Sequence, residues 1–74
     1  MFLDKLSLNK CGIIKSICCN PSIKRRLLDL GLVPGTIITP VFRSPLGEPT
    51  AYEFRNTVIS IRQEDSCLIE VSEK

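Results

Sequence analysis

The sequence contains no histidine and no tryptophan, and its only aromatic residues are three phenylalanines and one tyrosine. Without histidine, the chain lacks the most common general base and the most common nitrogen ligand for metals. Its 10 basic and 8 acidic residues give a net charge of only +2, and so few aromatics leave little material for stacking on bases. These shortages argue against a dedicated nucleic-acid-binding protein. No nucleophile with a partner base and no phosphate-binding glycine loop is recognisable, so we expect no enzyme and no catalytic residues.

The chain also lacks long apolar segments. No run approaches the roughly 20 apolar residues that a bilayer-spanning helix needs, so we expect no direct membrane insertion. The first ten residues, MFLDKLSLNK, contain Asp4 and no long apolar stretch of the kind found in signal peptides. We therefore expect a cytoplasmic protein in a reducing compartment, where disulfides are not expected.

The cysteines do not have the spacing of a known metal or redox motif. They are Cys11, Cys18, Cys19 and Cys67. No pair forms the C-x-x-C sequence that is typical of zinc sites and thiol oxidoreductases. We interpret them as small apolar core residues and expect no bound metal and no cofactor. A thiolate metal site built from all four is the alternative.

What the sequence does contain is a dense series of helix and turn signals after residue 19. Asn20 is a favourable helix N-cap, and Pro21 suits the first helical position because its missing N–H would be unpaired there. Apolar residues then recur at helical spacing, at Ile23, Leu27 and Leu30. The pattern predicts one short helix near residues 21–30.

Three residues after this helix have the chemistry of a helix end and a tight turn. Gly31 is expected at the position after the helix, where the backbone turns left-handed without a Cβ penalty. Pro34 and Gly35 fit the two central positions of a type II turn, the second of which needs a positive φ.

Residues 12–18 do not alternate cleanly but are rich in β-branched residues, which favours a strand. Later in the chain, apolar and polar residues alternate in short runs, which is also typical of strands. Strands are predicted at 12–18, 36–44, 50–55, 58–62 and 67–71, with a polar turn of helix at 63–66. In the second strand Ile38, Pro40 and Phe42 share one face, and Pro40 indicates a free edge or a bulge because it cannot donate to a ladder.

These elements predict a mainly β fold in a single domain over residues 1–74: a small, partly open barrel of about five antiparallel strands, with one short α-helix after the first strand. Residues 1–10 are interpreted as a lead-in segment. Its leucines are candidate core contacts: Leu3, Leu6 and Leu8.

Several of these motifs occur together in the order of a known family. The pattern R-L-x-x-L-G-x-x-P-G-x-x-I covers residues 26–38, and P-L-G-E-P covers residues 45–49. A strand containing Tyr52 follows, and the next strand ends in Ile61-Arg62 before an acidic turn at residues 64–65. Over roughly residues 11 to 72 the sequence resembles the FeoA family, the small cytosolic proteins of bacterial ferrous iron transport.

The resemblance implies an SH3-like barrel and a role beside FeoB, the membrane transporter with a cytosolic GTP-binding domain. The first functional hypothesis is therefore an accessory protein that regulates ferrous iron uptake by binding the cytosolic part of FeoB. The alternative is a stand-alone SH3-like accessory domain of an iron-dependent transcriptional repressor. The sequence leaves the oligomeric state open.

Two surfaces are candidates for partner binding. The first is the basic run Lys24, Arg25 and Arg26 on the predicted helix, although Arg26 could instead pair with Asp29 three residues on. The second is Leu46, an apolar residue at the tip of a loop that Pro45, Gly47 and Pro49 shape. The same loop could also be no more than a rigid hairpin connection.

Overall fold

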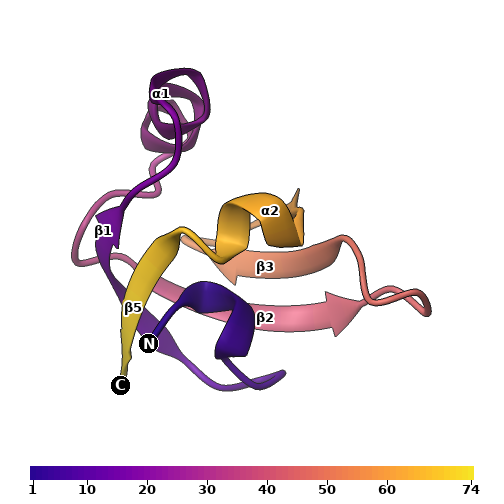
Figure 1. Ribbon diagram of the computed structural model, residues 1–74. Coiled ribbons are helices and arrows are strands. Elements are labelled where there is room, and N and C mark those ends of the chain that lie inside the picture. Colours follow the sequence, from indigo (N-terminus) through magenta and orange to yellow (C-terminus); the bar gives the residue numbers. More distant parts are fainter.

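The computed structural model describes all 74 residues and contains five strands, two α-helices and one 3₁₀ helix (Figure 1). In chain order they are η1 (Leu3–Lys5), β1 (Gly12–Ile17), α1 (Pro21–Asp29), β2 (Ile37–Arg43), β3 (Thr50–Phe54), β4 (Thr57–Ile61), α2 (Gln63–Ser66) and β5 (Ile69–Glu73). The strands form one antiparallel sheet in the order β4-β3-β2-β1-β5. This confirms the predicted mainly β fold of five strands with a short helix after the first.

The sheet curls at the middle of β2, where this strand changes its pairing partner from β1 to β3. Ile37 and Ile38 pair with β1, whereas the residues from Thr39 onward pair with β3. A β-bulge interrupts the second pairing between Pro40 and Phe42, as expected for a proline inside a strand. Because the bulge shifts the register, Phe42 does not share the inner face with Ile38 and Pro40, and 60% of it is exposed. The predicted alternation is therefore wrong at Phe42.

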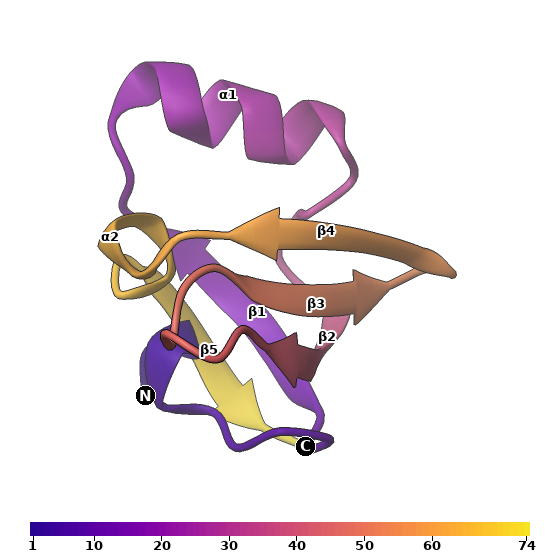
Figure 2. The same cartoon turned by 90° about the vertical axis from the view of Figure 1, so that its right-hand side faces the viewer.

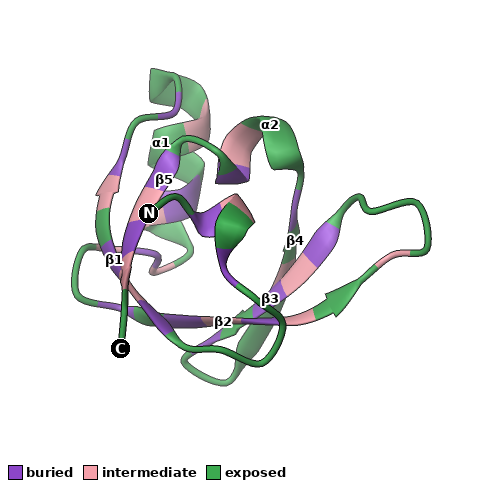
Figure 3. Cartoon of the chain, turned by 60° about the horizontal axis from the view of Figure 1, so that its bottom comes forward, coloured by how far each residue is buried: buried purple, intermediate pink, exposed green.

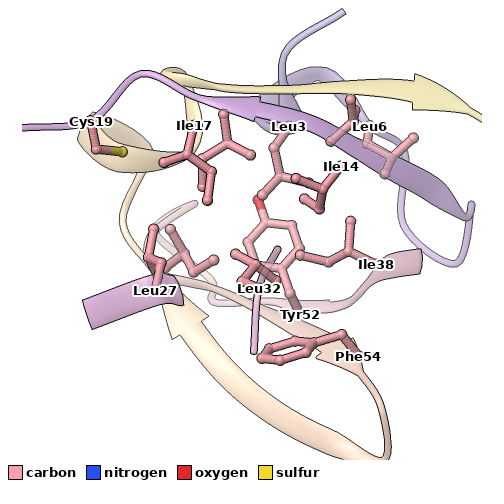
Figure 4. Packing of buried hydrophobic residues seen from close by; sticks show 13 residues of the cluster. Leu3, Leu6, Ile14, Ile17, Cys19, Leu27, Leu32, Ile38, Tyr52 and Phe54 are labelled. Carbon is pink, nitrogen blue, oxygen red and sulfur yellow. The ribbon is translucent and has the colours of Figure 1, made fainter. Parts of the chain in front are cut away.

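A cluster of 13 buried hydrophobic residues fills the curled sheet, and the ring of Tyr52 lies among the side chains at its centre (Figure 4). Figure 3 shows buried positions separated by intermediate or exposed ones along β1, β2, β3 and β5. The segment before β1 belongs to this core. Leu3 and Leu6 are buried, as predicted, because η1 turns them inward, whereas Leu8 is 40% exposed.

Local signals at both ends of α1 act as predicted. The Asn20 side chain accepts a hydrogen bond from the backbone N–H of Ile23 at 3.0 Å. Gly31 has a φ of 101°, and the N–H of Leu32 donates to the carbonyl of Leu27 at 3.0 Å, which closes a Schellman motif. Leu30 is 47% exposed, because it is the C-cap and lies outside the last helical turn.

The turn that leads into β2 is also confirmed. The N–H of Thr36 donates to the carbonyl of Val33 across Pro34 and Gly35, and Gly35 has a φ of 94°. The last strand begins later than predicted, at Ile69, because α2 runs to Ser66 and takes the next residues into its C-terminal turn. None of the helices has the length and apolar content required to span a bilayer.

Candidate functional site

The PLGEP loop consists of Ser44 and the motif at residues 45–49, and it connects β2 to β3. It is a short projection held by hydrogen bonds within the loop. The N–H of Gly47 donates to the carbonyl of Ser44 at 2.8 Å, and Gly47 has a φ of 87°. The hydroxyl of Ser44 donates to the carbonyl of Glu48. At the tip, 95% of Leu46 is exposed, which agrees with the expected position of this side chain.

The far end of the loop is attached to another element. The carboxylate of Glu48 accepts a hydrogen bond from the backbone N–H of Gln63 at 2.9 Å. Gln63 is the first residue of α2, so this bond also satisfies one of the free N–H groups at the start of that helix. The loop is therefore held at a second point, in addition to its two strands. No local pattern in the sequence indicates this contact.

The basic residues of α1 form the second candidate surface. Lys24, Arg25 and Arg26 are all exposed. Nε of Arg25 lies 3.4 Å from a carboxylate oxygen of Asp29, one turn further along the helix. Arg26 does not form the alternative pair with Asp29, because Asp29 pairs with Arg25, four residues before it.

Arg26 instead lies beside a groove between α1, β4 and the start of α2. The groove has a volume of about 250 Å³. Its lining combines apolar residues of α1 with charged residues on either side: Ile23, Arg26, Leu27, Ser60, Ile61, Arg62, Glu64 and Asp65. Arg26 and Arg62 form no ion pair. This groove was not predicted, because it depends on how α1 packs on the sheet.

The structure does not bring the two candidate surfaces together. Figure 1 shows α1 at one end of the molecule and the PLGEP loop projecting from the far ends of β2 and β3. The basic run and Leu46 therefore lie on separate surfaces of the molecule. They do not form a single pocket for a small molecule.

A polar pocket of about 210 Å³ lies beneath the PLGEP loop. Its lining residues are Asp4, Arg43, Gly47, Thr50, Tyr52, Gln63 and Ser66. Burial raises the pKa of the Tyr52 hydroxyl, and the neighbouring side chains of Ser66, Thr50 and Arg43 oppose this effect only in part. The hydroxyl thus remains protonated at neutral pH and acts as a hydrogen-bonding group, not as a base.

The cysteines differ from the prediction in three of four cases. Only Cys19 is buried, whereas Cys11, Cys18 and Cys67 are exposed. Cys18 and Cys67 are predicted in strands, but β1 ends at Ile17 and β5 begins at Ile69. The thiol of Cys19 donates to the carbonyl of Asp65 at 3.5 Å. Burial, followed by the charge of Asp65, raises the pKa of this thiol. No three Cys, Asp or Glu side chains are grouped so that they could hold a metal ion.

Comparison with known proteins identifies the family. The model of the FeoA domain family matches residues 1–73. This chain belongs to the FeoA family. The family is associated with ferrous iron transport, which agrees with the motifs in residues 26–38 and 45–49.

One FeoA relative is part of a much larger protein. The chain is 32% identical over 71 residues to the Fe(2+) transport protein A/Fe(2+) transporter FeoB fusion protein of Porphyromonas gingivalis. The match covers 96% of this chain and 8% of the relative.

Solved structures of FeoA proteins have the same fold. FeoA of Chlorobium tepidum is 29% identical, with a TM-score of 0.95 over 99% of this chain and 70% of that one. FeoA of Stenotrophomonas maltophilia, solved in complex with zinc, is 28% identical, with a TM-score of 0.86 over 100% of this chain and 95% of that one. The latter is described as a prokaryotic SH3 domain protein and a candidate ferrous iron transport activating factor, which supports the predicted SH3-like barrel.

Proposed function

We propose that this FeoA protein is a non-enzymatic, cytoplasmic regulator of ferrous iron uptake that binds the cytosolic part of a FeoB-type transporter. The observation that carries the proposal is the relative in which FeoA and FeoB form one polypeptide. Covalent linkage keeps two modules at a high effective concentration, which is useful when the modules act on each other. The fusion favours the transporter over a transcriptional repressor as the partner.

The PLGEP loop is the first contact surface that we propose. Exposure of 95% places the Leu46 side chain almost wholly in solvent, so it contributes little to the core and is available to a partner. The loop's own hydrogen bonds and its bond to α2 fix the tip before binding. A fixed tip loses little conformational entropy when it docks, so a single apolar side chain there can add affinity.

The basic run on α1 is the second contact surface. Lys24 and Arg26 have no ion-pair partner, whereas Arg25 is paired with Asp29. Exposed cations of this kind steer association with an acidic surface more than they strengthen the final complex. Charge removal at Lys24 and Arg26 should therefore slow association, with a smaller effect on dissociation.

Binding to the intact FeoB-type transporter of the same organism, reconstituted in nanodiscs, tests the proposal. Wild-type protein should bind, and Leu46→Glu should weaken binding at least tenfold while its melting temperature stays unchanged. Leu8→Glu is the matched control, because Leu8 is also exposed but lies outside both surfaces. Absence of any binding by the wild type would overturn the proposal. Equal binding by Leu46→Glu would remove the loop from the interface.

A further inference from the structure

The outer side of β4 carries backbone groups with no partner. Arg55 and Asn56 form a two-residue turn between β3 and β4, and both have positive φ. In such a hairpin the flanking residues exchange hydrogen bonds, and bonded positions then alternate along the strand. The residues that face β3 are therefore Thr57, Ile59 and Ile61. The N–H and C=O groups of Val58 and Ser60 point away from the sheet.

Nothing else in the molecule pairs with these outward groups. β4 is the edge of the sheet, with β3 as its only neighbour. The backbone hydrogen bonds of the turns, loops and caps include none from Val58 or Ser60. Two N–H donors and two C=O acceptors are thus aligned along the open side of β4.

The opposite edge of the sheet, formed by β5, is covered by another segment of the chain. Phe2 forms a β-bridge with Glu70, and the N–H of Val71 donates to the carbonyl of Met1 at 2.8 Å. The start of the chain therefore covers β5. Proteins usually protect an uncovered edge with a charge or a proline, because an open edge attracts other strands. The β4 sequence, TVISI, contains neither, and 58% of Val58 is exposed.

We propose that β4 binds an extended segment of the FeoB-type partner, which adds to the sheet as a sixth strand. This inference rests on the proposed function and specifies how the partner is recognised. A row of alternating backbone donors and acceptors is complementary to the backbone of another strand, and this mode of recognition recurs in peptide-binding domains. Alternate side chains of the added strand would face the groove between β4 and α1.

The position of α1 favours a single strand over a second copy of the chain. Figure 2 shows α1 alongside β4, on the side away from β3. Residues of α1 and of β4 line the same groove, which has a volume of about 250 Å³. A single extended segment needs little room, whereas a second copy would bring a whole sheet and its own α1 against this helix.

The charges around β4 indicate the character of the segment. Residues 55–62 include Arg55 and Arg62 and no acidic residue. Arg26 lines the same groove as Arg62, and neither is engaged in an ion pair. Glu64 and Asp65 lie at the α2 end of the groove. An acidic side chain in the added strand would thus be favoured beside the two groove arginines and disfavoured near α2.

Amide hydrogen exchange of the wild-type protein, free and bound to the FeoB-type transporter in nanodiscs, tests the inference. In the free protein the amides of Val58 and Ser60 should exchange much faster than that of Ile59, which is bonded to β3. In the complex both should become protected at least tenfold. Bound protein without this protection would overturn the inference and leave the proposed function standing. Protection in concentrated protein alone would assign the edge to a second copy and also overturn it.

A pair of substitutions at one position gives an independent readout. Val58→Pro removes an outward N–H that the sheet does not use, and proline is tolerated at such edge positions. Val58→Thr keeps the N–H and the β-branched shape. We expect Val58→Pro to bind the transporter at least tenfold more weakly and Val58→Thr to bind within threefold of the wild type. If Val58→Pro retains the sheet and binds normally, the inference is wrong; if it unfolds, the exchange measurement decides. Failure of the wild type to bind at all would overturn both proposals.

Discussion

The carboxylate of Glu48 accepts a hydrogen bond from the backbone N–H of Gln63 at 2.9 Å, across 15 residues of sequence. This bond connects the PLGEP loop to the first turn of α2. It also places a negative charge at the start of a helix, where the free N–H groups favour it. The orientation of the most exposed leucine in the protein thus depends on an element that follows two strands later.

Loss of this bond should loosen the loop. Glu48→Ala should speed amide exchange at Gln63 and Gly47 and lower the free energy of unfolding by about 0.5–1.5 kcal/mol. Glu48→Gln should have a smaller effect, since its amide oxygen can still accept the bond. Exchange rates and thermal melting measure both effects, with Glu53→Ala as a control because Glu53 forms no hydrogen bond through its side chain. Unchanged exchange at Gln63 in Glu48→Ala would show that the bond does not hold the loop.

Local backbone chemistry was predictable from the sequence. The cap at Asn20 and the left-handed residues Gly31 and Gly35 each depend on a few neighbouring residues, so their types alone indicated the geometry. The alternating pattern also indicated the four later strands, and the β-branched content indicated the first. The exposed position of the PLGEP tip is predictable for the same reason, since two prolines prevent the strands from continuing through it.

Features that depend on tertiary contacts were predicted poorly. Leu8 and Leu30 fit apolar patterns but lie just outside the elements that bury their neighbours. The apolar run at residues 67–71 predicts a strand that includes Cys67, because nothing in the sequence shows how far α2 extends. The groove beside Arg26 and the open edge at Val58 arise from the packing of α1 and the strand order, neither of which has a local signal.

Valine at either left-handed glycine should destabilise the protein. Gly31→Val and Gly35→Val should each cost about 1–3 kcal/mol of unfolding free energy, because β-branched residues are strained at positive φ. A Cβ at Gly35 would meet no atom within 4 Å, so the cost there comes from the backbone alone. D-alanine at Gly35, introduced by chemical synthesis, favours positive φ and should raise stability. Chemical denaturation measures all three, and a destabilising D-alanine would contradict this explanation.

Truncation of a leucine in the first segment should test whether that segment is part of the core. Leu3 has an exposed fraction of 0%, so Leu3→Ala should lower the free energy of unfolding by about 2–5 kcal/mol. Leu8→Ala removes the same atoms from a side chain that is 40% exposed and should cost much less, within about 1 kcal/mol. Equal losses from the two variants in urea denaturation would show that residues 1–10 do not pack as described.

Stability should decline in alkaline solution because of the buried thiol of Cys19. Its pKa is raised in the folded protein, mainly by burial and then by the charge of Asp65. In the unfolded chain a cysteine loses its proton near pH 8.5, about the value for free cysteine. Between that pH and the higher folded pKa the unfolded state binds fewer protons, so a rise in pH favours unfolding. The loss approaches about 1.4 kcal/mol per pH unit for one full proton.

Denaturation curves from pH 7 to pH 9.5 measure this slope. Cys19→Ala should lower stability at pH 7, because it removes a buried side chain, but should flatten the decline above pH 8.5. Cys11→Ala removes an exposed thiol instead and should keep the wild-type slope. The pKa of Tyr52 is also raised, chiefly by burial, and its contribution begins only near pH 10, above the measured range. If Cys19→Ala loses stability with pH as steeply as the wild type, the decline must come from another group, and Cys19 does not control the alkaline limit.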